Sequence, residues 1–210
     1  MDILDEAKEE VQIERFVRVY KRYGKYLVSL LFMVLACSVF YFWWQNHQGN
    51  ITSEEASEYN DALSAEKTSM ISKLESLKGK KTIYAQLAHL QLAGIYADEK
   101  DFNKAAHNYE QLISKGGVDP IYLDYAKLML VKIKSFAGIA NGKAAIGLFD
   151  QYLSTAIYFK NIARLEKAAL LINQGDIDKA HAELDFVVTD ANAPRALVNI
   201  AQVIKKSAVK

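Results

Sequence analysis

The pattern of hydrophobic and polar residues changes character near residue 45. Before that point, residues 26–44 form one uninterrupted hydrophobic run. After it, segments rich in Ala, Leu, Lys and Glu mix hydrophobic and polar positions, which favours helices almost throughout. Glycine, proline, asparagine or aspartate marks the breaks, as in Gly116-Gly117, Asp119-Pro120 and Gly175-Asp176. The predicted helices cover residues 54–78, 82–98, 102–115, 120–138, 142–157, 160–174, 177–189 and 194–206.

Two stretches of this helical region resemble each other when one is shifted by 75 positions. Residues 88–113 read AHLQLAGIYADEKDFNKAAHNYEQLI, and residues 163–188 read ARLEKAALLINQGDIDKAHAELDFVV. A weaker third copy, residues 128–153, lies between them and carries Lys143-Ala144 in its Lys-Ala position. The period of roughly 36 to 40 residues is typical of helix-turn-helix arrays, in which small residues let paired helices approach closely. The shift aligns Ala88 with Ala163, Leu90 with Leu165, Ala93 with Ala168, Asp101 with Asp176, Lys104 with Lys179 and Ala105 with Ala180.

The hydrophobic run has the length of a membrane anchor. Residues 26–44 carry no formal charge, and as a helix they would span roughly 28 Å, close to the hydrocarbon thickness of a bilayer. Aromatic residues at both ends resemble interfacial belts. A buried soluble helix is the less favoured alternative because the run has no polar face. We therefore predict a single N-terminal transmembrane helix in contact with membrane lipid.

Two kinds of cleavage compete with a permanent anchor. A secretory signal has a short basic segment and a small-residue exit, whereas here 25 residues precede the run and it closes with FYFWWQ. The residues before Cys37 loosely resemble a lipoprotein signal, but Leu35 is large for its position and an exposed apolar stub would remain after processing. An uncleaved anchor is the favoured interpretation.

Basic residues beside the run predict its orientation. Five lysines and arginines lie between residues 15 and 25, and none lies between residues 45 and 66. By the positive-inside rule the N-terminus is cytoplasmic and the rest of the chain lies across the membrane. The predicted organisation is a cytoplasmic juxtamembrane segment at 1–25, a transmembrane helix at 26–44, a linker at 45–53 and a helical domain at 54–210. The juxtamembrane segment is predicted either to lie on the inner leaflet as a short helix or to extend the transmembrane helix.

Composition indicates no catalytic or cofactor chemistry. The net charge of +1 provides no basic footprint for nucleic acid. One cysteine allows no internal disulfide or Cys-x-x-Cys pair, and the four histidines have no metal-ligand spacing. Nucleotide-binding and nucleophile motifs are absent from the sequence. We predict a non-enzyme without a metal, a cofactor or a small-molecule substrate.

The repeats resemble the tetratricopeptide repeat (TPR). Its small and large positions are occupied in the first copy, for example by Ala93, Tyr96 and Ala105, and in the last copy by Ala168 and Ala180. The early tryptophan and closing proline of the regular repeat are absent. The fold class expected is therefore all-α, with one transmembrane helix followed by a TPR-like α-helical solenoid.

The order of parts in the whole chain is similar to one family of membrane-anchored TPR-like proteins. It comprises an acidic N-terminus, a Tyr-Gly-Lys approach at residues 23–25, one span closing in YFWWQN, and an all-helical domain. The chain thus resembles the ancillary Sec translocon subunits of the bacterial inner membrane, whose TPR-like domain is periplasmic. The resemblance implies translocon subunits, a periplasmic chaperone and exported clients as partners.

The functional expectation is a single-pass scaffold that binds proteins during or after export, in the bacterial cytoplasmic membrane. The alternative is an adaptor in cell-envelope assembly or division with the same architecture. Candidate protein-binding residues are Tyr84, Gln91, Tyr122 and Tyr125, with Gln86, Asp124 and Lys132 in the same helices; packing is the competing role for each tyrosine. The lysines at 73, 78, 80 and 81 are interpreted as a solvated helix end rather than a site for an acidic partner.

Overall fold

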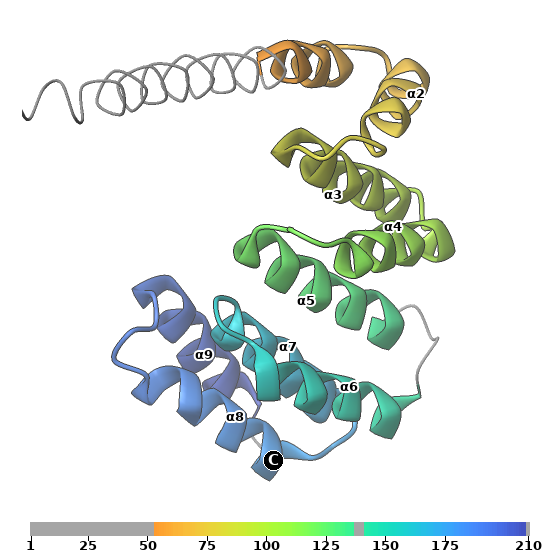
Figure 1. Ribbon diagram of the computed structural model, residues 1–210. Coiled ribbons are helices and arrows are strands. Elements are labelled where there is room, and N and C mark those ends of the chain that lie inside the picture. Colours follow the sequence, from red (N-terminus) through yellow and green to blue (C-terminus); the bar gives the residue numbers. More distant parts are fainter. Residues whose placement is uncertain (1–52, 137–140, 209–210) are drawn as a thin grey trace, which may run out of the picture. The chain divides into compact units, whose positions relative to one another are not determined.

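A computed structural model describes residues 53–136 and 141–208, and all regular structure within them is helical (Figure 1). Residues 55–210 form one compact unit. The predicted anchor at 26–44, the segment 1–25 and most of the predicted linker lie outside the described residues. Within the residues that are described, no helix is long and apolar enough to cross a membrane.

The helices follow the predicted order closely. A helix covers residues 53–63. It is followed by α2 (Lys67–Leu77), α3 (Ile83–Asp98), α4 (Phe102–Ser114), α5 (Pro120–Phe136), α6 (Gly142–Thr155), α7 (Lys160–Asn173), α8 (Ile177–Thr189) and α9 (Arg195–Ser207). From α3 onward, every helix in the described part of the chain begins and ends within two residues of its predicted bounds.

The prediction of one helix at 54–78 was wrong, because the chain turns at residues 64–66. Ala62 and Leu74 are fully buried in the same cluster, packed with Leu92 of α3. In a continuous helix these two residues would be separated by roughly 18 Å along the axis, and they could not share that partner. The turn is closed by a hydrogen bond from the Ala65 N–H to the Ala62 carbonyl.

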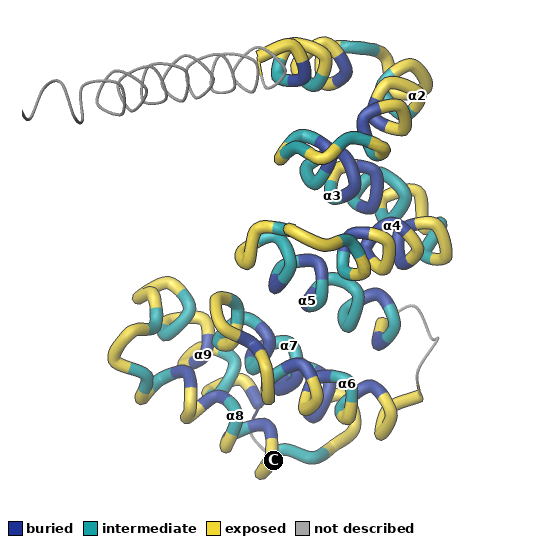
Figure 2. Tube along the Cα trace, in the orientation of Figure 1, coloured by how far each residue is buried: buried dark blue, intermediate teal, exposed yellow. Residues whose placement is uncertain are grey.

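Helices that follow one another in the chain pack against one another. We call the first helix of each pair an A helix (53–63, α3, α5, α7 and α9) and the second a B helix (α2, α4, α6 and α8). Neighbouring A helices also touch, as α3 does α5 and α7 does α9. Buried positions gather where helices face each other (Figure 2), in a row of small core clusters rather than one large core. This nearest-neighbour packing is the mark of a repeat stack.

The two similar stretches have the same local structure. The alanines that the shift pairs, such as Ala93 with Ala168 and Ala105 with Ala180, are fully buried, so they let the A and B helices approach closely. Both A helices end with a tight reversal, in which the Asp101 N–H donates to the Tyr96 carbonyl at 2.8 Å and Asp176 makes the equivalent bond at 2.9 Å. The helical repeat predicted from the sequence is therefore confirmed.

Candidate functional site

Each A helix that has a described successor is joined to it by a polar side chain from its first two turns. We call these contacts the clasps. In each clasp the side chain reaches the loop that precedes the next A helix, so the clasps set the spacing of the A helices. They pair Glu55 with the Thr82 hydroxyl, Gln86 with the Gly117 carbonyl and the Asp119 N–H, Asp124 with the N–H groups of residues 157–159, and Asn161 with Asp190.

The Asp124 clasp is the most heavily bonded. One carboxylate oxygen, Oδ2, accepts from the backbone N–H groups of Ile157, Tyr158 and Phe159 at 3.1, 2.7 and 3.3 Å. These donors belong to the loop before α7 and have no helical acceptor of their own. Since Asp124 is 6% exposed, the clasp is largely shielded from water and fixes the start of α7 against α5.

Three tyrosines come from three A helices, and we call them the tyrosine cluster: Tyr59 and Tyr84, whose rings are in contact, and Tyr122, which is near enough to Tyr59 to affect its ionisation. The rings of Tyr59 and Tyr84 are 5.8 Å apart between centroids and tilted by 43°. Burial, and next the neighbouring hydroxyl of Tyr122, raise the pKa of Tyr59 above its ordinary value. All three side chains are half-buried, so each is held by packing and still exposes an edge.

Two of the predicted binding residues are thus related to Tyr59, Tyr84 by a ring contact and Tyr122 by its electrostatic effect on the Tyr59 hydroxyl. Gln91 is exposed on α3, two turns beyond Tyr84. Tyr125 is half-buried, and its ring forms a T-shaped pair with that of Phe159, with centroids 5.7 Å apart and planes inclined by 66°. It therefore packs between α5 and the start of α7.

The polar candidates are engaged within the fold. Gln86 and Asp124 form clasps, and Lys132 pairs with Glu166 across α5 and α7. Tyr59 was missed by sequence reasoning. The signal that could have found it is its position one helical turn before the small residue Ala62, on the helix 53–63 that comes before α3 in the row of A helices.

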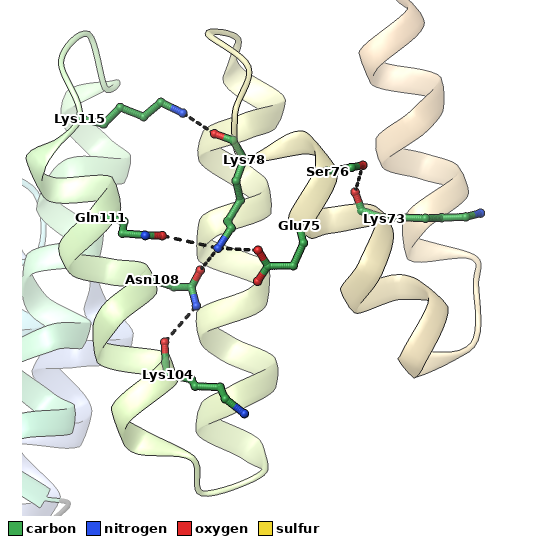
Figure 3. A network of polar contacts seen from close by, with 8 residues as sticks. All are labelled: Lys73, Glu75, Ser76, Lys78, Lys104, Asn108, Gln111 and Lys115. Atoms are coloured by element: carbon green, nitrogen blue, oxygen red, sulfur yellow. Dashed lines mark hydrogen bonds and ion pairs between the residues drawn. The ribbon is translucent and has the colours of Figure 1, made fainter.

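The interpretation of the lysines at 73–81 as a solvated end is wrong for Lys78, which belongs to a network between α2 and α4 (Figure 3). Lys78 Nζ lies 2.7 Å from Glu75 and donates to Asn108 Oδ1 at 3.2 Å. Lys115 Nζ donates to the carbonyls of Lys78 and Lys80 at 2.7 and 2.9 Å. Lys115 in this way satisfies two carbonyls just after the last residue of α2.

His89 of α3 is buried beside this network. Its Nδ1 has no hydrogen-bond partner in the described part of the chain. Burial lowers the pKa of His89 to about 4, and the charges of Lys115 and Lys78 act in the same direction. Asn108 and Glu75 oppose the change weakly. The imidazole is therefore neutral at pH 7 and serves as a packing residue.

In the last repeat, charged side chains occupy the positions equivalent to His89 and its neighbours. Where the first repeat has His89, Leu92 and Asn108, the shift of 75 positions places Arg164, Lys167 and Glu183. Glu183 accepts from Arg164 at 2.6 Å and from Lys167 at 2.5 Å, and Lys167 also reaches Asp150. Burial lowers the pKa of Lys167, but hydrogen bonds to the two carboxylates outweigh it, so the pKa lies above its usual value.

Comparison with known proteins agrees with this architecture. The family model described as a tetratricopeptide repeat-like domain matches residues 18–142, more than half of the chain. No curated protein matches the sequence. Over residues 53–136 and 141–208, no three or more His, Cys, Asp or Glu side chains are grouped so that they could hold a metal ion.

Proposed function

This chain belongs to the tetratricopeptide repeat-like domain family, and from that premise we propose that it is a single-pass membrane scaffold whose repeat domain binds proteins outside the cytoplasm. Domains of this kind are generally protein-interaction modules without catalytic activity. The proposed setting is the bacterial inner membrane, where the chain is ancillary to the Sec translocon and to a periplasmic chaperone during protein export.

The tyrosine cluster is the observation that carries the binding function. Tyrosine offers a rigid apolar face and a hydroxyl at little cost in side-chain entropy, which makes it a frequent anchor in protein interfaces. Tyr59, Tyr84 and Tyr122 come from three A helices that the clasps hold in register. A partner segment lying across them contacts three repeats at once.

Support for the membrane setting comes from the sequence. Residues 26–44 have the length and lack of charge of an anchor, and the basic residues before them favour an N-terminus in the cytoplasm. Anchoring raises the effective concentration of partners held at the same membrane, so modest affinity suffices. The order of parts in the chain supports the translocon as the place where this happens.

A site-specific crosslinking experiment tests the proposal. A photoreactive residue is placed at Gln91, which is exposed on the same helix as Tyr84, in the full chain in cells. The matched control is His107, which is exposed on the B helix α4. We expect crosslinks to translocon subunits, a periplasmic chaperone or exported clients from position 91 and not from position 107. Recovery of only division or wall-synthesis proteins would replace the proposal with the envelope adaptor.

A topology experiment tests the membrane setting separately. A reporter that is active only outside the cytoplasm is fused after Lys210. Activity of the fusion is the expected result, and an inactive fusion with intact protein would refute the orientation. The outcome does not depend on which partners are bound.

A further inference from the structure

A groove opens between α5 and α6, with the end of α4 at its side. It is a hollow of about 500 Å³, and its floor contains Leu130 and Val131 of α5 together with Leu148 of α6. Leu130 packs on the core cluster shared with α3 and α4, whereas Val131 packs on the cluster shared with α6 and α7. The groove therefore lies where two neighbouring core clusters meet and leave apolar surface uncovered.

Most of the lining comes from two helical stripes. From α5 the groove receives Lys127, Leu130, Val131 and Lys134, which are spaced i, i+3, i+4 and i+7. From α6 it receives positions 148, 151, 152 and 155, which have the same spacing, together with Ser154 beside them. This spacing marks one face of each helix, about two turns or 10 Å long. A third helix can lie between two such faces, with its own side chains in the gaps.

This face of α5 differs from the one that bears the tyrosines. Tyr122 and Tyr125 share a stripe with Lys132, and that stripe lies on a different side of α5 from positions 127, 130, 131 and 134. An occupant of the groove would therefore leave the tyrosine cluster accessible. The groove and the tyrosine cluster therefore do not overlap.

The charges beside the groove indicate what kind of helix it can bind. Lys127 and Lys134 flank the apolar floor, and none of the residues that line the groove is acidic. Lys134 is paired with Glu110 of α4 at 2.8 Å. Lys127 has no acidic partner within residues 53–136 and 141–208. A helix that places a carboxylate at Lys127 meets an unpaired charge, whereas one that places a lysine there is repelled.

We propose that this groove binds an acidic amphipathic helix of a partner protein, with an apolar stripe on Leu130, Val131 and Leu148 and a carboxylate at Lys127. The scaffold then has two separate docking surfaces, one on its A helices and one between α5 and α6. It can hold two partners at once.

A synthetic helix tests the proposal. The probe is a fluorescent peptide of about four turns, with leucine at i, i+3, i+4 and i+7 and glutamate at the flanking positions. Its binding to the purified full chain is followed by fluorescence anisotropy. A peptide of the same composition with its leucines scrambled is the first control. Saturable binding of the probe and not of the scrambled peptide is expected, and equal behaviour of the two would overturn the proposal.

A charge-reversal variant tests whether the probe binds at the groove. Lys127→Glu is expected to weaken the glutamate probe about five-fold and to strengthen a second probe with lysine in place of glutamate. Lys206→Glu alters an exposed lysine on α9 and is the matched control, for which neither affinity changes. Both probes are measured on the same variant. A variant that no longer folds would bind both probes more weakly, whereas a change of charge at the groove strengthens the lysine probe. Equal effects of the two variants would overturn the proposal.

The other occupant of such a groove is a second copy of this chain. Sedimentation of the chain over a range of concentrations tests for it. A monomer that binds the probe supports the proposal. A dimer that the probe dissociates would assign the groove to self-association and overturn the proposed foreign helix.

Discussion

The Asp124 clasp predicts a large loss of stability from a single small substitution. In Asp124→Ala, three backbone N–H groups lose the one oxygen that accepts from them. The shortest bond, 2.7 Å from Tyr158, is charge-assisted and contributes roughly 1.5–2 kcal/mol, and the two longer bonds contribute roughly 0.5–1 kcal/mol each. Ile157 and Tyr158 are 71% and 51% exposed, so water recovers part of this. The expected decrease in the free energy of unfolding is about 2–3 kcal/mol.

Urea unfolding of the full chain, followed by helical circular dichroism, measures this decrease. Asp124→Asn keeps an acceptor oxygen in place and should lose only about half as much, since the charge is gone but the shape remains. Asp98→Asn alters an exposed carboxylate on α3 and should stay within about 0.5 kcal/mol of the wild type. Hydrogen exchange of the 157–159 amides gives a local readout, because their protection depends on the clasp. If Asp124→Ala unfolds at the same urea concentration as Asp98→Asn, the clasp does not stabilise the stack.

Three further predictions concern single positions in the repeats. Lys100 has a φ of 61° where the equivalent Gly175 has 81°, so Lys100→Gly should stabilise the chain by about 0.5–1 kcal/mol in urea unfolding and Gly175→Lys should destabilise it by a similar amount. The folded-state pKa of His89, about 4, lies below its ordinary 6.5, so the unfolded chain binds the proton more tightly and stability falls as pH falls through this window. Unfolding free energies at pH 7 and pH 5 should differ by about 2 kcal/mol more in the wild type than in His89→Leu. Glu183→Ala leaves the buried Lys167 and the half-buried Arg164 without their shared partner and should cost about 2–3 kcal/mol, whereas Lys167→Leu should change stability by less than about 1 kcal/mol because Glu183 keeps its arginine. A larger cost for Lys167→Leu than for Glu183→Ala would contradict this order.

The helices could be predicted because most breaks between them carry their own local signal. Gly116-Gly117, Gly175-Asp176 and Asn192-Ala193-Pro194 end or begin a helix by their backbone preferences. The turn at residues 64–66 has no such signal, since serine, alanine and glutamate are all tolerated within helices. Burial of Ala62 against Leu74 decides it, and that is tertiary information.

The functional surfaces were less accessible to sequence reasoning. Tyr84 and Tyr122 were among the predicted binding residues; Tyr84 is in ring contact with Tyr59 and Tyr122 acts on it electrostatically, but whether either binds a partner stays a prediction. Gln86, Asp124 and Asn161 occur at intervals of 38 and 37 residues, close to the repeat period, yet they differ in type and in the groups they bind. The groove depends on how α5 and α6 are spaced, which no local pattern specifies. The translocon, the anchor and the cellular location stay predictions from the sequence.

The clasps also fix an order in which the domain can be completed. Each clasp joins a side chain to a loop that lies only 27 to 35 residues later in the chain. When the chain emerges N-terminus first from a ribosome or a membrane pore, each A helix can therefore form its clasp as soon as the loop before the next A helix has emerged. None of the clasps found in residues 53–136 and 141–208 waits for the C-terminus, so the stack can fold progressively while the rest of the chain is still being delivered.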